Sequence, residues 1–200
     1  MTIIGITGGT GAGKTTALLA LEKLGARIID CDSVYHDLLK SSAPLCKDIA
    51  THFPGTVTDG VLDRKVLGNR VFSDEKLLKE LSSLTSGYVL EAVRGIIDEE
   101  TARGGRLCAV DAIGLFESGL NYICKFTVAV TAAKETRIAR IMAREGISRE
   151  YAERRVDAQK PESYYAEKCD YVLRNDGSKE EFLESCEKFF SEILGRQTDV

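Results

Sequence analysis

Residues 8–15 have the types and spacing needed to bind phosphate. They read Gly-Gly-Thr-Gly-Ala-Gly-Lys-Thr, which fits the pattern G-x-x-x-x-G-K-[ST] of a phosphate-binding loop. In such a loop the glycines let successive backbone N–H groups surround phosphate oxygens, and the helix that follows turns its positive end toward the anion. We therefore predict a nucleoside triphosphate site in which Lys14 contacts the β- and γ-phosphates and the Thr15 hydroxyl binds Mg²⁺. The residues expected around the phosphates are Gly9, Thr10, Gly11, Ala12, Gly13, Lys14, Thr15 and Thr16.

Carboxylates follow two further apolar runs of the chain. Asp30 and Asp32 follow the run 27–29, and Asp111 follows the run 107–110. If both runs are strands of a parallel sheet, these side chains share the edge at which the phosphate loop lies. Asp32 is then a candidate to accept a proton from an attacking hydroxyl, and Asp111 to bind Mg²⁺ directly or through water. The spacing leaves open that Asp32 caps a helix, that Asp30 is a surface acid, and that Asp111 is a turn residue.

Three arginines recur with helical spacing later in the chain. Arg137, Arg140 and Arg144 stand at positions i, i+3 and i+7, so a helix presents them on one face. Such a face predicts a lid that neutralises charge on transferring phosphates. The alternative is a solvated face in which the arginines pair with neighbours such as Glu135 and Glu145.

The overall composition limits the partners. The chain has 200 residues and a formal net charge of −4, which argues against a broad basic face for nucleic acid. A local guanidinium such as Arg64, which follows Asp63, is still able to bind a compact anionic acceptor. No apolar run approaches eighteen residues and no charged segment precedes a long apolar one, so we expect neither a membrane span nor a signal peptide. Six cysteines without metal-binding spacing predict reduced, packed thiols and a cytoplasmic protein.

An α/β pattern is expected to position these residues. Five short runs rich in β-branched residues alternate with helical stretches, which is typical of a parallel sheet in one domain. The expected strands are Ile3–Thr7, Arg27–Asp30, Leu107–Asp111, Phe126–Val130 and Asp170–Leu173. The expected core comprises residues 1–40, 104–134 and 168–200, with an inserted helical lobe at about 41–103 and a lid at about 135–167.

Helical periodicity defines the rest of this expected layout. We predict helices at about Asp74–Arg103 in the lobe, Glu135–Glu145 and Arg149–Gln159 in the lid, and Lys179–Leu194 at the end of the core. Ser148 is the expected N-cap of the second lid helix. The tail Gly195–Val200 is expected to be frayed.

Several of these segments together resemble the dephospho-coenzyme A kinase family over nearly the whole chain. The phosphate loop is common to many kinases, whereas residues 59–64 (Asp-Gly-Val-Leu-Asp-Arg) and 115–117 (Leu-Phe-Glu) are more specific to this family. The other segments that carry the resemblance are residues 4–16, 29–32, 71–72, 152–159 with Arg155, and 170–175. The resemblance implies the three-layer α/β sandwich of a phosphate-loop kinase, with a five-stranded parallel sheet, a helical lid and an inserted helical substrate lobe.

The resemblance also implies an activity and roles for individual residues. The activity is ATP-dependent phosphorylation of the ribose 3′-hydroxyl of dephospho-coenzyme A, the last step of coenzyme A biosynthesis. Asp32 is similar to the family's acid that faces the acceptor hydroxyl. The implied lid arginines are Arg140 and Arg144, the residue near the ATP adenine is Asn175, and the acceptor-side residues are Arg64, Leu115, Phe116 and Glu117. The chain departs from the family pattern at Ser86-Gly87, Ile113-Gly114 and Tyr165.

Other classes of protein share parts of this pattern. A kinase for a nucleoside or nucleoside monophosphate has the loop and lid but is not expected to carry the 59–64 segment. A regulatory GTPase is expected to show an Asn-Lys-x-Asp motif, which this sequence lacks. A nucleotide-binding module without activity keeps Lys14 but does not need Asp32. The sequence does not define the oligomeric state.

Overall fold

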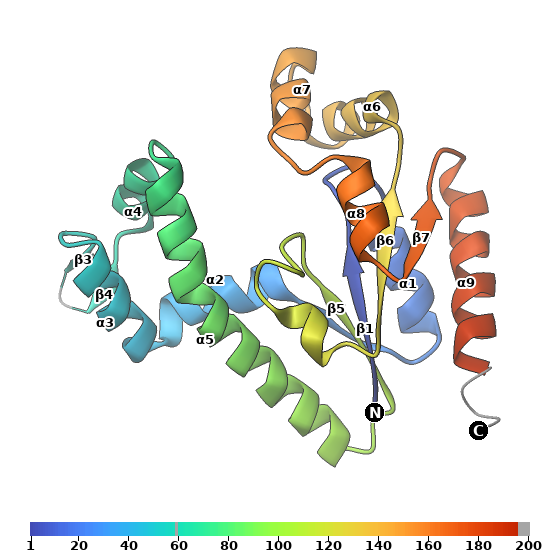
Figure 1. Ribbon diagram of the computed structural model, residues 1–200, viewed down its shortest axis with the longest axis horizontal. Coiled ribbons are helices and arrows are strands. Elements are labelled where there is room, and N and C mark those ends of the chain that lie inside the picture. Colours follow the sequence, from blue (N-terminus) through green and yellow to red (C-terminus); the bar gives the residue numbers. More distant parts are fainter. Residues whose placement is uncertain (59, 196–200) are drawn as a thin grey trace.

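A five-stranded parallel sheet forms the centre of the computed structural model, which describes residues 1–58 and 60–195 (Figure 1). Its strands lie in the order β2-β5-β1-β6-β7. Their bounds are β1 (Thr2–Thr7), β2 (Arg27–Asp30), β5 (Leu107–Asp111), β6 (Phe126–Thr131) and β7 (Tyr171–Arg174). All six residues of β6 and the last four of β1 are buried, because central strands of a parallel sheet are covered on both faces.

Helices cover both faces of this sheet, which confirms the predicted three-layer arrangement. On one face α1 (Lys14–Lys23) packs beside α9 (Lys179–Gly195), and Leu21 and Phe190 are fully buried there. The other face is covered by α2 (Cys31–Ser41), the second half of α5 (Glu75–Ala102) and the short 3₁₀ segment η1 (Leu120–Ile123). In the described part of the chain, no helix combines the length and apolarity needed to cross a membrane.

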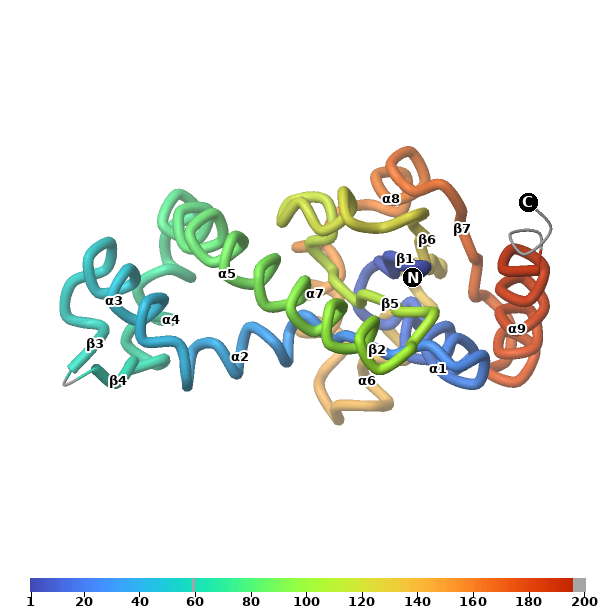
Figure 2. The backbone as a smooth tube through the Cα atoms, turned by 90° about the horizontal axis from the view of Figure 1, so that it is seen from below, coloured from blue at the N-terminus to red at the C-terminus, as the bar shows by residue number. Residues whose placement is uncertain are grey.

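A separate lobe extends from one side of the sheet, at the far end of the molecule from α9 (Figure 2). It contains α3 (Ala43–His52), the hairpin of β3 (Val57–Thr58) and β4 (Val61–Leu62), α4 (Arg64–Val71) and the first half of α5. The hairpin was not predicted from the sequence, because each of its strands has only two residues. Asp59, in the family-like segment 59–64, lies outside the described residues.

The long helix α5 belongs to both the lobe and the core. Leu81, near its start, packs with the lobe, whereas Val93 and Ile97 pack with the sheet. The packing boundary therefore lies within α5 and not near residue 103, because a helix of 28 residues is long enough to join the two hydrophobic cores.

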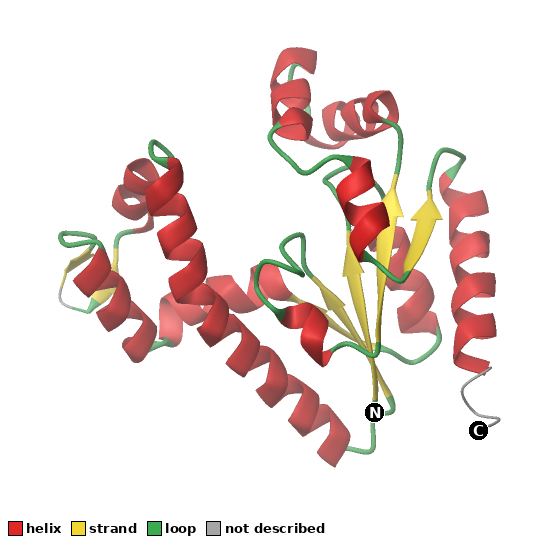
Figure 3. Ribbon diagram, in the orientation of Figure 1, coloured by secondary structure: helices red, strands yellow, loops and turns green. Residues whose placement is uncertain are grey.

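The lid consists of two packed helices above the carboxyl ends of the strands (Figure 3). These are α6 (Lys134–Glu145) and α7 (Arg149–Asp157), which share a small buried cluster around Ile138 and Ala152. Ser148 caps α7 by accepting a hydrogen bond from the backbone N–H of Tyr151 at 3.3 Å, as predicted. The next helix, α8 (Glu162–Lys168), packs against β6 and β7 and so joins the lid to the core.

The predicted strands and long helices agree with the structure to within two residues at each end. Gly195 ends α9, and the rest of the tail that was expected to fray, residues 196–200, lies outside the described residues. All six cysteines are free, and Cys31, Cys46, Cys108 and Cys186 are buried.

Candidate active site

Glycines shape the loop between β1 and α1. Gly8 has φ +135° and Gly13 has φ +106°, a region that glycine adopts without steric cost. A Cβ atom on Gly8 would lie 2.1 Å from the carbonyl oxygen of Val130, and one on Gly13 would lie 2.0 Å from Nδ2 of Asn175. The loop is therefore packed tightly against β6 and against the chain that leaves β7, and neither of these two positions has room for a side chain.

Lys14 and Thr15 begin the helix behind this loop. Lys14 is half-buried, and its Nζ donates a hydrogen bond to the carbonyl oxygen of Gly8 at 3.1 Å. Thr15 is exposed beside it, whereas Thr16 is buried and its backbone N–H donates to Gly13 O at 3.0 Å. The ammonium group and the Thr15 hydroxyl thus lie at the positive end of α1, where an anion is favoured.

The tip of the loop is held by two side chains from the lid. Gln159 Oε1 accepts from the backbone N–H of Thr10 at 2.9 Å, and its Nε2 donates to Thr10 Oγ1 at 2.7 Å. Arg137 Nε donates to Thr10 O at 2.9 Å, and its Nη2 donates to Gln159 Oε1 at 2.5 Å. Arg137 is only 8 % exposed, and burial lowers the pKa of its guanidinium. Lid and loop are therefore joined by a partly buried polar network.

Asn175 supports the loop from the other side. Its Nδ2 donates to Ala12 O at 2.8 Å, and the side chain is 4 % exposed. Arg140 donates to Asn175 O and to Asn175 Oδ1, both at 3.1 Å, and lies 3.5 Å from Gly11 O. The family resemblance implied that Asn175 lies near the ATP adenine; in the structure its amide contacts the loop backbone at Ala12.

The three arginines that were predicted to share one helix face make different contacts. Arg137 and Arg140 contact the loop, whereas Arg144 is exposed and ion-paired with Glu145 at 2.6 Å. The alternative of a solvated, ion-paired face therefore describes Arg144. Since Arg144 lies at the last turn of α6, its side chain extends beyond the loop network.

Three carboxylates meet at the edge of the sheet beside the loop. The Asp30 side chain caps α2 and accepts from the backbone N–H groups of Asp32 at 2.9 Å and of Ser33 at 3.3 Å. The alternative in which Asp32 is the N-cap is therefore wrong, because α2 begins at Cys31 and its N-cap is Asp30. The exposed Asp32 side chain instead faces a cavity.

Asp111 has the chemistry expected of a metal ligand that acts together with phosphates. The pKa of Asp111 is raised to about 6, mainly because the carboxylate is buried; the nearby Lys14 lowers the pKa in part, and the charges of Asp30 and Asp32 contribute to raising it. Asp111 Oδ1 is buried without a hydrogen-bond partner among the described residues. Within residues 1–58 and 60–195, no three His, Cys, Asp or Glu side chains form a ready-made metal site. Mg²⁺ usually binds through one or two side chains together with substrate phosphates, so the Thr15 hydroxyl and Asp111 fit such an ion.

A cavity of about 440 Å³ opens between this edge and the lobe. Asp32, Arg64 and Glu117 provide its charged groups, and the lobe provides an apolar wall that includes Leu67 and Phe72. Arg64 Nη2 donates to the carbonyl oxygen of His36 on α2 at 2.9 Å, so α4 contacts the helix that carries Asp32. The positions that depart from the family pattern are also at the site: Ser86, Ile113 and Gly114 line the cavity, and Tyr165 is buried beside Gly9.

The three residues of the predicted acceptor segment 115–117 lie in different environments. Leu115 is fully buried, and a Cβ on Gly5 would lie 2.8 Å from its Cδ2, so its side chain packs in the core and cannot contact an acceptor in this structure. Phe116 is half-buried with Lys168 Nζ 5.4 Å from its ring centroid. Glu117 reaches the cavity and accepts a hydrogen bond from the Tyr164 hydroxyl at 2.7 Å.

Gln159 and Tyr164 are site residues that sequence reasoning missed. Gln159 stood at the end of a family-like segment, but nothing in its spacing indicated a contact with Thr10, 149 positions away. Tyr164 lies in a stretch without apolar periodicity. Neither side chain has a sequence signal that reveals its partner.

Comparison with known proteins identifies the family. The sequence model of the dephospho-CoA kinase family matches residues 2–181. The chain is 33 % identical to the dephospho-CoA kinase of Anaeromyxobacter dehalogenans strain 2CP-C, covering 98 % of this chain and 93 % of the relative. A crystal structure from Thermus thermophilus superposes with a TM-score of 0.73 at 34 % identity, covering 98 % and 97 % of the two chains. The dephospho-CoA kinase of Campylobacter jejuni superposes with a TM-score of 0.67 at 25 % identity, covering 96 % of each chain. The family model matches most of the chain, and a relative of the same family is 33 % identical over 98 % of it, so this chain belongs to the dephospho-CoA kinase family.

Proposed function

We propose that the residues of this site have separate roles in the reaction of the family. That reaction is the ATP-dependent phosphorylation of dephospho-CoA at the ribose 3′-hydroxyl, the last step of coenzyme A biosynthesis. One observation carries the proposal. Asp32 lines the cavity, and its charge raises the pKa of Asp111. The charge of Lys14, in the phosphate loop, lowers the pKa of the same carboxylate, so Asp32 and Lys14 both lie near Asp111. An acceptor in the cavity is therefore next to the phosphates of an ATP molecule in the loop.

Asp32 orients the attacking hydroxyl and takes its proton late in the transfer. Phosphoryl transfer has a loose transition state, so a carboxylate does not need unusual basicity for this role. The Asp32 side chain is available for it because Asp30 already caps α2.

Positive charge is supplied from the loop and from the lid. Lys14 exchanges its hydrogen bond with Gly8 O for the β- and γ-phosphates, and Arg140 adds a guanidinium beside Gly11. Arg144 must exchange Glu145 for a phosphate to take part. Thr15 and Asp111 would hold Mg²⁺, which screens the phosphate charge when bound. Gly9 to Thr16 would enclose the ATP phosphates, and Asn175 would keep that backbone in place through Ala12.

The acceptor cavity combines charge with an apolar wall. Arg64 would bind the diphosphate of dephospho-CoA, and Glu117 would accept hydrogen bonds from hydroxyl or N–H groups of the same molecule. The Leu67 and Phe72 side of the cavity would take an uncharged part of the same molecule. We also propose a cytoplasmic location, which the six free cysteines support.

A comparison of two variants tests the role of Asp32. Asp32→Asn should lower kcat by about 100-fold or more, the usual range for loss of an acid–base group, while ATP affinity stays nearly unchanged. Asp37→Asn is the matched control and should retain full activity, because Asp37 lies exposed on the same helix and its carboxylate is ion-paired with Lys40. Release of ADP is measured with dephospho-CoA and with a panel of nucleosides and nucleotides. Equal loss of turnover and ATP affinity in Asp32→Asn would mean that Asp32 is structural.

A further inference from the structure

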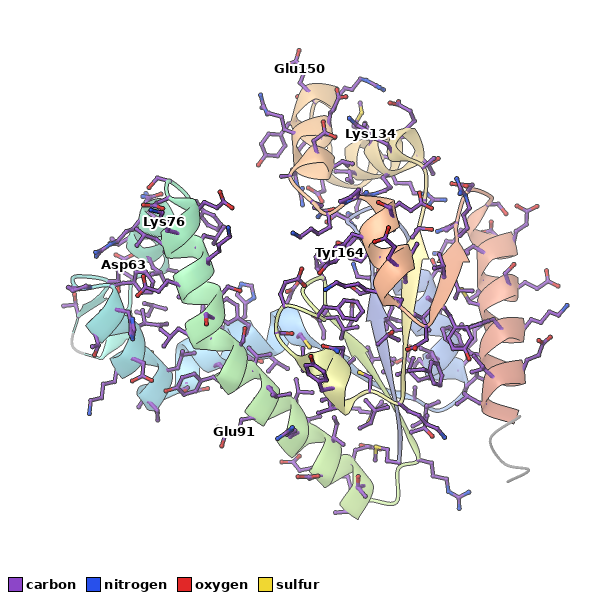
Figure 4. The ribbon with its side chains drawn as sticks, in the orientation of Figure 1. Asp63, Lys76, Glu91, Lys134, Glu150 and Tyr164 are labelled. Atoms are coloured by element: carbon purple, nitrogen blue, oxygen red, sulfur yellow. The ribbon has the colours of Figure 1, made fainter. Side chains whose placement is uncertain are left out.

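The hydroxyl of Tyr164 contacts the acceptor side of the site from the lid end of the molecule. Tyr164 lies on α8, on the side that faces the loop after β5, as Figure 4 shows. Its Oη lies 2.7 Å from Oε1 of Glu117. Glu117 in turn lines the cavity that also contains Asp32.

The Tyr164 ring is fixed by its neighbours. Tyr165, which is only 2 % exposed, anchors this turn of α8, and the two rings meet edge to face at 5.4 Å. Lys168 Nζ lies 5.0 Å from the Tyr164 ring centroid and Lys160 Nζ lies 5.3 Å from it. Lys168 also lies over Phe116, the residue before Glu117. The hydroxyl therefore has a defined place relative to the acceptor loop.

The direction of the hydrogen bond follows from protonation. Partial burial and the hydrogen bond to Glu117 raise the pKa of Tyr164 to about 12, so the phenol keeps its proton near neutral pH. Tyr164 donates and Glu117 accepts. A hydrogen bond to a carboxylate is about twice as strong as one between neutral groups, which suits it to holding a side chain in place.

Glu117 needs such support because its side chain is exposed. The backbone of its loop is held by Thr7, whose Oγ1 donates to Ile113 O at 3.1 Å. Among the described residues, Tyr164 is the one that forms a hydrogen bond with the Glu117 carboxylate. Without the phenol hydroxyl, the carboxylate is free to rotate at the rim of the cavity.

Resting on the proposed function, we infer that Tyr164 is a positioning residue that holds the Glu117 carboxylate at the acceptor cavity and so sets the affinity for dephospho-CoA. The same short segment reaches the ATP side, because Gln159, five residues earlier, binds Thr10 of the phosphate loop. Residues 159–164 thus contact both substrate sites, each through a different side chain.

Steady-state kinetics of Tyr164→Phe test this inference. The variant keeps the ring and its lysine contacts but removes the hydroxyl, so KM for dephospho-CoA should rise about fivefold to tenfold while KM for ATP is unchanged. The Tyr164→Phe/Glu117→Gln double variant should be no weaker in acceptor binding than Glu117→Gln alone. Tyr151→Phe on α7, whose exposed ring lies 5.7 Å from the Arg154 guanidinium, is the matched control and should behave as wild type.

A spectroscopic readout separates this inference from the proposed function. Tyrosinate absorbance is titrated in wild type and in Glu117→Gln, and the Tyr164→Phe variant identifies the Tyr164 transition. Glu117→Gln should lower the pKa of Tyr164, whatever the acceptor. An unchanged transition, an unchanged KM for dephospho-CoA, or an equal rise in both KM values would overturn the inference. If wild type used another acceptor instead, the proposed function would fail, and KM for that acceptor in Tyr164→Phe would decide the role of Tyr164.

Discussion

Replacing Asp111 with Asn should make the stability of the protein depend less on pH. The folded-state pKa of about 6 lies above the ordinary value of 3.8, mainly because Asp111 is buried. The folded protein therefore keeps a proton that the unfolded chain has released, so stability from this group is greatest below pH 3.8 and falls as pH rises through 6. A tenfold change in the ionisation constant corresponds to about 1.36 kcal/mol, so the ionisation of Asp111 lowers the free energy of unfolding by about 3 kcal/mol at a pH well above 6. Roughly half of this loss is already present at pH 5.

Urea unfolding of the protein without nucleotide or Mg²⁺ measures this cost. The difference in unfolding free energy between Asp111→Asn and wild type should increase in favour of the variant by about 1.4 kcal/mol between pH 5 and pH 8. Asp37→Asn, at an exposed position, should show no such trend. A difference that stays constant with pH, or one that decreases, would refute the reasoning that burial destabilises the charged carboxylate.

Two further predictions concern the phosphate loop. Lys14→Ala should weaken ATP binding by about tenfold or more and should also slow phosphoryl transfer, because the ammonium group contacts phosphates in both the ground state and the transition state. Calorimetric ATP binding and single-turnover rates measure the two effects. An unchanged rate would contradict the loop assignment. Gln159→Ala removes three hydrogen bonds at the loop tip, two to Thr10 and one from Arg137, and should raise KM for ATP by about tenfold without changing KM for dephospho-CoA. An unaltered KM for ATP in that variant would mean that the tip needs no support from the lid.

Local patterns predicted the sheet and the loop well. Runs such as Phe126–Val130 are buried on both faces, so their composition directly reflects their place in a parallel sheet. The loop was recognisable because glycine is required where φ is positive and neighbouring backbone is close, as at Gly8 and Gly13. In both cases the physical requirement acts on adjacent residues.

Contacts between distant residues were not predictable in this way. Arg137, Arg140 and Arg144 lie on one face of α6 but differ in their surroundings. Arg137 is buried at the loop, Arg140 binds Asn175, and Arg144 is ion-paired at the surface. Spacing defines a helical face but not what packs against it. The same limit applies to Asp30 and Asp32, which are two residues apart. Asp30 caps α2 and Asp32 lines the cavity, an assignment that the sequence left open.

The identity and position of the product test the central claim most directly. Purified protein is incubated with Mg²⁺, ATP and dephospho-CoA, and the product is examined by mass spectrometry and by ³¹P NMR. The account predicts coenzyme A with its new phosphomonoester on the ribose 3′-oxygen, formed in equal amount to ADP and nearly absent with Asp32→Asn. Phosphate on another oxygen, or undiminished product from Asp32→Asn, would contradict the assignment of Asp32 to the acceptor hydroxyl.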